Sequence, residues 1–433
     1  MSSIAVGRHS VGVLVDLVWH PQAGGHVKCW ERFAEAAATA DLNLDLTVYY
    51  LGPAEKVIPL TEHVRYHLLP PVLGTDRFPF LRQGGGDTDL APYHPRLAHL
   101  LRRHHILHTT DVFTFAQTAG RVARRHQIPL VSSLHTDLPK FTRIYAREII
   151  GRLLPGVLNR FAFDRLRLDE MLAADMARKL RRYMAQSDQV LVSNPEDLSW
   201  VSALVPPERI SRLRRGIDAE RFHPRWRDRT RLAQTYGIDP DVPLLLFVGR
   251  VDPSKGADIL AQAARRLLDQ GHRLHVLMVG AGASRPAVQA LLQEHVTLPG
   301  ALPQTDLPWI YASADAFVFP SQTDVLPNVV LEAKAAGRPV FVSAGDGAAQ
   351  LIGMSGRDGL IVPSTHPAFW AAEIQPYLIE PSVLQEMGAA ARHWVEHTWP
   401  TWLTVLQEDL FPVWQKLVRS EDSSDVPRHN MLG

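Results

Sequence analysis

Two series of short apolar runs, separated by helical patterns, constrain the fold of this chain most strongly. In the first half, the run from Val11 to Val18 is almost wholly apolar, and a glycine-containing turn and a helical pattern from about Val27 to Ala40 follow it. A continuous apolar run of this length is typical of a strand buried on both faces of a parallel sheet. Further strands are predicted at 44–50, 105–109, 129–133 and 189–192. The first half therefore predicts a doubly wound α/β domain.

A second series follows a stretch at 205–224 that we interpret as a linker. Its strands are predicted at 243–248, 274–279, 316–319 and 339–342. A chain of 433 residues is too long for one ordinary core, so we expect two Rossmann-like domains that face a central cleft. We place the first domain at 1–205, the second at 206–395, and a tryptophan-rich helical segment at 396–433 that packs back across both.

Composition narrows the classes of function and location. The formal net charge is +1, which argues against a nucleic-acid binder. The single cysteine, Cys29, excludes an intrachain disulfide and suits a reducing cytoplasm. Neither a signal peptide nor an apolar run of about 18 residues is visible, so we expect a cytoplasmic protein whose membrane contact, if it has one, is peripheral at the inner face.

No group of residues has the spacing of a metal site, so no metal is expected. The triplet Asp87-Thr88-Asp89 is similar to a metal-binding D-x-D motif, but no strand precedes it. We interpret the triplet as part of a solvated loop.

Cationic residues follow the first strand of the second series. That strand ends at Gly249, and Arg250 and Lys255 lie in the loop before a helix that begins near Ala257. The carboxyl ends of strands are where open α/β sheets bind ligands. A guanidinium grips phosphate in a bidentate way and an ammonium adds a point charge. The loop therefore predicts a diphosphate site, although such a pair is as often an ordinary surface feature.

Two carboxylates with seven residues between them flank a predicted helix start. Asp324 lies in the loop after the strand at 316–319, and Glu332 lies about one turn into a helix that begins at Asn328. Backbone N–H groups at that helix start suit an anion, and the carboxylates can accept hydrogen bonds from sugar hydroxyls. The alternative is structural: Asp324 as a turn or capping residue and Glu332 as a favourable charge in the first turn.

Two further features are weaker. The turn Val279-Gly280-Ala281-Gly282 allows a close approach of a ligand to the backbone, or serves only a tight turn. A lone histidine is more often structural than catalytic, but His135 closely follows the strand at 129–133, and a place at a strand's carboxyl end favours a functional role.

Residues 140–182 form a basic helical region. It holds 11 Lys/Arg and 5 Asp/Glu, with apolar residues interleaved. One interpretation is a solvated helical excursion, and the other is an amphipathic surface that touches anionic lipid.

With these residues assembled, the chain resembles glycosyltransferase family 4, a retaining family with the GT-B fold. The resemblance covers nearly the whole chain and is most specific at Ser321–Val340, which is similar to the family's acidic–x7–Glu signature and the following A-x-G-x-P-V. Other matching stretches are Gly216-Ile217-Asp218, Gly249-Arg250, Lys255-Gly256, Gly300-Ala301-Leu302, Tyr311–Asp315 and Arg357-Asp358-Gly359.

The resemblance implies a retaining hexosyltransferase, with no cofactor beyond a UDP- or GDP-sugar donor as substrate. It implies that the donor's diphosphate contacts Arg250 and Lys255, that Glu332 holds the ribose, and that Asp324 holds the transferred sugar. The remaining implied contacts are Gly24 and Gly25 beside the phosphates and acceptor, His135 beside the anomeric centre, and Gly249, Leu326, Asn328 and Val329 around the donor.

The chain also departs from the family pattern. Asp324 stands where many members have Glu, Pro327 removes a backbone donor, and Arg215 stands where many members have Asn. The local sequence looks most like the branch that glycosylates lipids, which implies a membrane lipid as the acceptor. A nucleotide-sugar epimerase and a non-catalytic nucleotide-sugar-binding protein are the alternatives.

Overall fold

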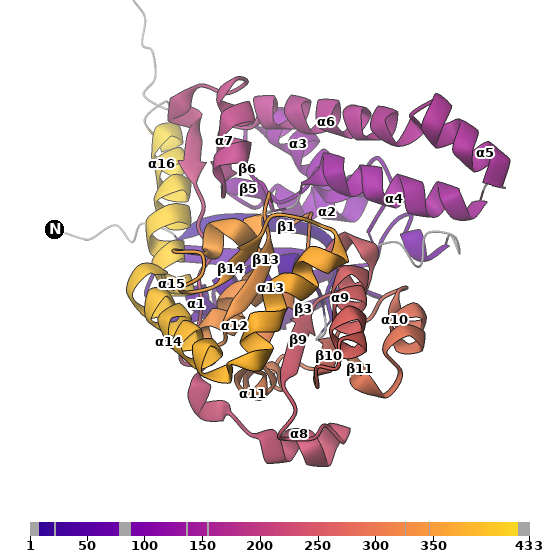
Figure 1. Cartoon of the computed structure of the whole chain (residues 1–433). Coiled ribbons are helices and arrows are strands. Elements are labelled where there is room, and N and C mark those ends of the chain that lie inside the picture. The colour runs from indigo at the N-terminus through magenta and orange to yellow at the C-terminus, as the bar shows by residue number, and fades with distance from the viewer. Residues whose placement is uncertain are drawn as a thin grey trace, which may run out of the picture.

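The computed structural model describes residues 8–20, 23–77, 88–135, 137–153, 156–324, 326–345 and 347–422. These residues form two α/β units, each built around its own sheet (Figure 1). Every pair of neighbouring strands is parallel except one, so the two predicted parallel sheets are present.

The first sheet has the order β3-β4-β2-β1-β5-β6-β7-β8, and β3 is its antiparallel edge strand. Its central strand, β1, contains the apolar run predicted at 11–18, whose side chains up to Asp16 are buried. The strands are β1 (His9–Val18), β2 (Leu44–Leu51), β3 (Lys56–Pro59), β4 (Val64–Leu69), β5 (Ile106–Thr109), β6 (Leu130–Ser133), β7 (Gln189–Val192) and β8 (Ile210–Arg212).

Helices cover both faces of this sheet, which gives the unit two cores. One core contains α1 (Gly25–Thr39) together with residues from the C-terminal end of the chain. The other contains α2 (Pro95–Leu101), α3 (Thr114–His126) and part of α6 (Leu168–Gln186). The unit is therefore doubly wound, as predicted.

The second sheet has the order β11-β10-β9-β12-β13-β14 and encloses a single large core. Its strands are β9 (Leu244–Val248), β10 (His275–Val279), β11 (Val296–Gly300), β12 (Ala316–Phe319), β13 (Val340–Ser343) and β14 (Leu360–Val362). The helices of this unit are α8 (Arg229–Tyr236), α9 (Ala257–Asp269), α10 (Arg285–Leu292), α11 (Leu307–Ser313), α12 (Asn328–Ala335), α13 (Pro367–Ile379) and α14 (Pro381–Thr398).

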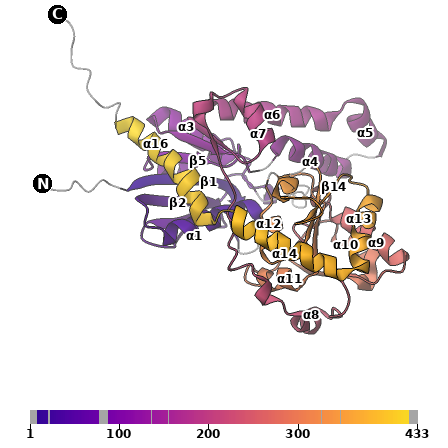
Figure 2. The same ribbon diagram turned by 60° about the vertical axis from the view of Figure 1, so that its left-hand side comes forward.

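The C-terminal helices return to the first unit. After α14, the chain continues through α15 (Trp402–Val405), a π-helical turn at Leu406–Leu410 and α16 (Phe411–Asp422). Figure 2 shows α14 along the second unit and α16 along the first. Trp402 and Trp414 are buried in the core that contains α1, so this segment ties the two units together. A Cβ on Gly216 would lie 2.4 Å from the Trp402 Cα, and this close approach of the linker requires glycine.

A helical arm projects from the first unit between β6 and β7 (Figure 1). It consists of α4 (Leu138–Leu153), α5 (Gly156–Arg160), a π-helical turn at Phe161–Arg165, and α6. Helices α4 and α6 pack against each other along the arm. The short helix α7 (Pro195–Ser202) follows β7.

The interpretation of 205–224 as a linker was wrong in part. It contains β8, which pairs with β7 as the last strand of the first sheet. Its three residues are only partly buried or exposed, so they lack the kind of apolar run from which strands were predicted. The first sheet thus extends past residue 205, and the domain bounds stay a prediction.

Candidate functional site

The loop after β9 places Arg250 and Lys255 at the carboxyl end of the second sheet, as predicted. Asp252 caps the short 3₁₀ turn Pro253–Lys255, because its side chain accepts a hydrogen bond from the Lys255 amide. A Cβ on Gly280 would lie 1.8 Å from the Gly249 carbonyl oxygen. The neighbouring glycine turn therefore packs directly against this loop, whereas its predicted approach to a ligand stays a prediction.

Lys255 and Asp324 form an ion pair across this site. The Lys255 Nζ lies 2.7 Å from Asp324 Oδ1 and 2.8 Å from Oδ2, and Ser321 Oγ donates to Oδ2 at 2.6 Å. Burial alone would raise the pKa of Asp324, but Lys255 and the Ser321 hydroxyl bring it below its usual value. Asp324 is therefore a charged counter-ion of Lys255.

Glu332 lies on α12, beyond the loop that carries Asp324. The Tyr311 hydroxyl donates to Glu332 Oε2 at 2.9 Å. Burial raises the pKa of Glu332, while Tyr311 and the positive charges of Arg32 and Arg221 oppose that rise. Arg32 belongs to α1 of the first unit, so Glu332 faces the junction of the two units.

The start of α12 forms the wall between these carboxylates. Leu326 is buried, Asn328 and Val329 are partly buried, and the helix has no side-chain cap at Pro327. The Asn328 Oδ1 atom is buried without a hydrogen-bond partner among the described residues.

On the first unit, Gly24 and Gly25 begin α1 and are exposed. A Cβ built on either residue would meet no atom within 4 Å, so the backbone here is open to an approaching group.

His135 lies deeper in the first unit. Its ring is buried, and both of its nitrogens have partners: Nε2 lies 2.7 Å from Ser133 Oγ, and Arg215 Nη2 lies 2.7 Å from Nδ1. The structure thus joins His135 to the linker through Arg215. The roles predicted for all of these residues stay predictions.

A family model described as "Glycosyl transferases group 1" matches residues 228–394. This stretch of the second unit is similar to the group 1 glycosyl transferases. A GDP-mannose-dependent alpha-(1-6)-phosphatidylinositol monomannoside mannosyltransferase of Mycolicibacterium smegmatis is 31% identical over 233 residues, 51% of this chain and 60% of the relative. A D-inositol 3-phosphate glycosyltransferase of Streptomyces bingchenggensis is 31% identical over 295 residues, 63% of this chain and 59% of the relative. The chain thus spans less than two thirds of the length of these relatives.

Solved structures show the fold of this chain. The sucrose-phosphate synthase of Thermosynechococcus elongatus superposes with a TM-score of 0.71 at 19% identity, covering 95% of this chain and all of that one. The Anabaena protein HepE, solved with UDP-glucose, superposes with a TM-score of 0.61 at 15% identity over 96% of this chain and 99% of that one. The predicted GT-B fold and the family resemblance are confirmed.

The sequence did not reveal the residues of the arm that contact the loop after β9. Arg250 Nη1 donates to the Tyr145 hydroxyl, which lies 3.2 Å from Asp252 Oδ2. The guanidinium carbon also lies 5.7 Å from the centre of the Phe141 ring. Burial raises the pKa of Tyr145 to about 12, so this hydroxyl stays protonated near neutrality. The sequence feature that could have indicated this contact is the spacing of Phe141 and Tyr145, which places both rings one turn apart on α4.

The interpretation of the D-x-D triplet as a solvated loop was wrong for Asp89. This residue is buried and accepts hydrogen bonds from the amides of Val72, Leu73 and Ala91. The Asp89 carboxylate therefore holds the loop together through backbone amides at both of its ends. Asp87 lies outside the described residues. Among the described residues, no three His, Cys, Asp or Glu side chains gather as a metal site.

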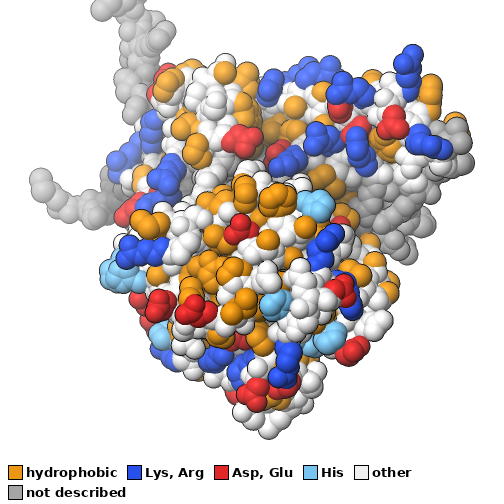
Figure 3. Space-filling view, viewed as in Figure 1, with side chains coloured by type: hydrophobic (Ala, Val, Ile, Leu, Met, Phe, Trp, Pro, Cys, Tyr) orange, Lys and Arg blue, Asp and Glu red, His pale blue; other side chains and the backbone are white. Residues whose placement is uncertain are grey.

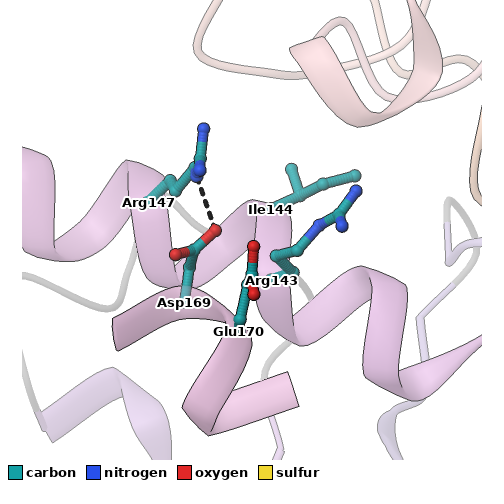
Figure 4. A pocket seen from close by; sticks show the side chains of 5 residues that line it. All are labelled: Arg143, Ile144, Arg147, Asp169 and Glu170. Atoms are coloured by element: carbon teal, nitrogen blue, oxygen red, sulfur yellow. Dashed lines mark hydrogen bonds and ion pairs between the residues drawn. The ribbon is translucent and has the colours of Figure 1, made fainter. Parts of the chain in front are cut away.

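A pocket of about 310 Å³ lies on the arm, away from the predicted site residues. Figure 4 shows Arg143, Ile144 and Arg147 of α4 facing Asp169 and Glu170 at the start of α6. Arg147 Nε donates to Asp169 Oδ2 at 2.6 Å. This pair fastens the two helices of the arm to each other, so we interpret the pocket as part of the arm's own structure.

Proposed function

We propose that the chain is a retaining glycosyltransferase that moves a hexose from a UDP- or GDP-sugar to an acceptor hydroxyl. The observation that carries the proposal is the ion pair of Lys255 and Asp324 beside Arg250, at the carboxyl ends of β9 and β12. At this place, two cationic side chains that can bind a diphosphate lie beside a carboxylate that can accept hydrogen bonds from sugar hydroxyls. The family match of this unit, and the UDP-glucose in the HepE structure, support the same donor class.

The proposed reaction needs no protein nucleophile. The bond between the anomeric carbon and the diphosphate oxygen breaks, and the acceptor oxygen bonds to the same face of that carbon. The acceptor's proton passes to the departing phosphate oxygen. Arg250 and Lys255 stabilise the negative charge that grows on this leaving group. When the Lys255 ammonium pairs with the donor's phosphate, it no longer occupies the oxygens of Asp324. These oxygens can then accept hydrogen bonds from hydroxyls of the sugar.

Glu332 completes the donor site in this proposal. Tyr311 holds Oε2, which leaves Oε1 for a ribose hydroxyl. Closure of the two units over the donor would exclude water and limit its hydrolysis.

The nucleotide-sugar proposal predicts a selective rise in thermal stability. We expect a UDP- or GDP-sugar at about 100 times its Kd to stabilise the chain by about 2.7 kcal/mol, because ligand binds only the folded state. The matching nucleoside, which lacks the diphosphate, should produce a much smaller shift at the same concentration. The measurement is a thermal shift screen of UDP-, GDP- and ADP-sugars, and the proposal fails if none of them raises the melting temperature.

Product analysis separates the enzyme from its alternatives. A transferase releases nucleoside diphosphate in step with a glycosylated acceptor. An epimerase converts the donor without any acceptor, and a binding protein gives a thermal shift but no product.

We further propose a lipid acceptor at the surface of an anionic membrane. The M. smegmatis relative acts on a phosphatidylinositol monomannoside, according to its name. No helix in the described part of this chain is both long and apolar enough to cross a bilayer. Contact would therefore be made by a surface, and the arm offers one.

The outer end of the arm combines exposed apolar and basic side chains. Leu158, Phe161 and Leu166 are each more than half exposed, and exposed arginines lie next to them in the sequence at Arg160, Arg165 and Arg167. Figure 3 shows Lys and Arg side chains along this arm with apolar side chains between them. Two interactions hold a protein at a membrane surface: apolar side chains enter the boundary of the acyl chains, and cationic side chains attract anionic headgroups.

Membrane binding by the arm predicts a charge-dependent sedimentation result. We expect the chain to pellet with vesicles that contain phosphatidylglycerol and much less with pure phosphatidylcholine, with binding weakened by salt. Phe161→Glu combined with Leu166→Glu should abolish pelleting. Ile379→Glu, which changes an even more exposed apolar residue of the second unit, is the control and should pellet like the parent. Equal pelleting of all three proteins would contradict the assignment to the arm.

A further inference from the structure

A chain of buried hydrogen bonds runs from the C-terminal helix to the linker between the units. Trp414 Nε1 donates to His108 Nδ1 at 3.3 Å, and His108 Nε2 lies 2.9 Å from Ser133 Oγ. Ser133 Oγ lies 2.7 Å from His135 Nε2, and Arg215 Nη2 lies 2.7 Å from His135 Nδ1. These five residues, here called the histidine chain, are all buried.

The two ends of the histidine chain decide the position of every ring proton. An indole N–H and a guanidinium can only donate hydrogen bonds. The Nδ1 atoms of His108 and His135 must therefore accept, so neither carries a proton. A neutral imidazole then has its proton on Nε2, and both Nε2–H groups point at the same Ser133 oxygen. A hydroxyl oxygen has two lone pairs, so it can accept both.

We infer that the histidine chain locks His135 as a neutral imidazole with its proton on Nε2, and that His135 is a positioning residue rather than a general acid or base. To accept a proton at Nδ1, His135 would have to place an N–H against an N–H of Arg215 and break their hydrogen bond. To donate from Nε2, it would have to leave Ser133. The catalytic half of this inference rests on the proposed transferase function, whereas the tautomer does not.

The charges around His135 act in the same direction. His26 of α1 stacks on its ring at a centroid distance of 4.7 Å, and burial together with Arg215 lowers the pKa of His26 to about 3. Cys29, one turn further along α1, lies 2.9 Å from Arg215 Nη1, and burial raises its pKa to about 11. Burial lowers the pKa of His108 to about 3, and burial followed by the charge of Arg215 lowers that of His135. Near neutral pH, Arg215 is thus the charged member of this cluster.

Arg215 is one of the departures from the family that the chain resembles, in which many members have Asn at this position. Its Nε atom is buried without a partner among the described residues. An asparagine amide could still donate to His135 Nδ1, but it would bring no charge. The arginine therefore adds an electrostatic barrier to protonation that the common residue would lack.

The test is a direct measurement of the tautomer by NMR. The full chain is labelled with ¹⁵N-histidine, and two-bond ¹H–¹⁵N correlations are recorded from pH 5 to pH 8. His135 is assigned from the His135→Gln spectrum or, if that variant does not fold, from through-space contacts to the Trp30 ring, which packs against it. We expect a proton on Nε2, none on Nδ1, and no titration. An Nδ1–H tautomer, or an imidazolium that forms within this range, overturns the inference.

Variants at the two ends of the histidine chain separate what each end contributes to the protonation of its rings. Arg215→Asn should raise the pKa of His135 only in part, because burial, the larger cause of its depression, remains; the spectra are therefore continued to the lowest pH at which the chain stays folded, where His135 should begin to titrate at a higher pH than in the parent. Arg215→Lys, which keeps the charge, should not produce this shift, and Trp414→Phe should release the tautomer of His108 while His135 stays fixed. With an active donor, any loss of rate on acidification should begin at a higher pH in Arg215→Asn than in the parent. If no donor supports transfer, the proposed function fails, and the tautomer result still decides the inference.

Discussion

Replacement of Lys255 by alanine should lower the rate of sugar transfer by about 10²- to 10³-fold, the usual cost of removing one preorganised donor from a developing negative charge. The ammonium is held at 2.7 Å from Asp324 before any donor binds, so it is already in place when the diphosphate arrives. The measurement is kcat/KM for the donor in a product-release assay. An unchanged value would contradict the assignment of the diphosphate site to this loop.

A second variant separates two causes of that loss. Lys255→Ala also leaves Asp324 without its counter-ion, and an unpaired carboxylate would repel the diphosphate. In Lys255→Ala combined with Asp324→Asn, this repulsion is absent. Because Asp324 is itself proposed to hold the sugar, the double variant is compared with Asp324→Asn alone. Equal rates for these two variants would mean that Lys255 serves only to neutralise Asp324, whereas a lower rate in the double variant supports direct contact of Lys255 with phosphate. Lys56→Ala, at an exposed lysine on β3, should leave the rate unchanged.

Burial explains which parts of the fold could be predicted from the sequence. The strands found in advance, such as β1, β9 and β12, are continuous apolar runs because both of their faces are covered. The strands β3, β4, β8, β11 and β14 were missed. Four of them lie at the edges of the two sheets and are exposed or only partly buried over much of their length. The fifth, β4, is a buried inner strand whose apolar run is interrupted by Arg65 and His67. An edge strand needs no apolar run, and its pairing depends on residues far away in the sequence.

The same distinction applies to the candidate site. Lys255 and Asp324 were each predicted as site residues because each lies in a loop that follows a strand of the second series, but their ion pair was not predicted. The contact of Arg250 with Tyr145 joins residues 105 positions apart on different units, and no periodicity within one unit predicts such a contact. The neutral state of His135 likewise depends on Trp414 and Arg215, whose donor-only character matters only once the fold has brought them to the ring.

Asp358→Asn should destabilise the second unit by about 3–5 kcal/mol, because it leaves the buried ammonium of Lys334 without its charged partner. Lys334 Nζ lies 2.6 Å from Asp358 Oδ2 and 2.6 Å from the Leu351 carbonyl oxygen, and its side chain is fully buried. Asp358 also accepts hydrogen bonds from the amides of Gly353 and Met354. The expected result is a large fall in the urea midpoint, followed by circular dichroism.

A compensating variant tests whether the stranded charge is the cause. Lys334→Met removes the ammonium, and the thioether side chain can still pack on Trp394, whose ring centre lies 3.6 Å from Nζ. In Lys334→Met combined with Asp358→Asn, no buried charge remains, although the single asparagine oxygen can keep only one of the two hydrogen bonds from the Gly353 and Met354 amides. This double variant should therefore recover much of the lost midpoint, since replacing both partners of a buried pair costs far less than removing one. Asp175→Asn, which breaks an exposed pair with Lys179 on α6, is the control and should leave the midpoint nearly unchanged. If the double variant is as unstable as Asp358→Asn, then the backbone hydrogen bonds of Asp358, rather than its charge, hold this part of the second unit together.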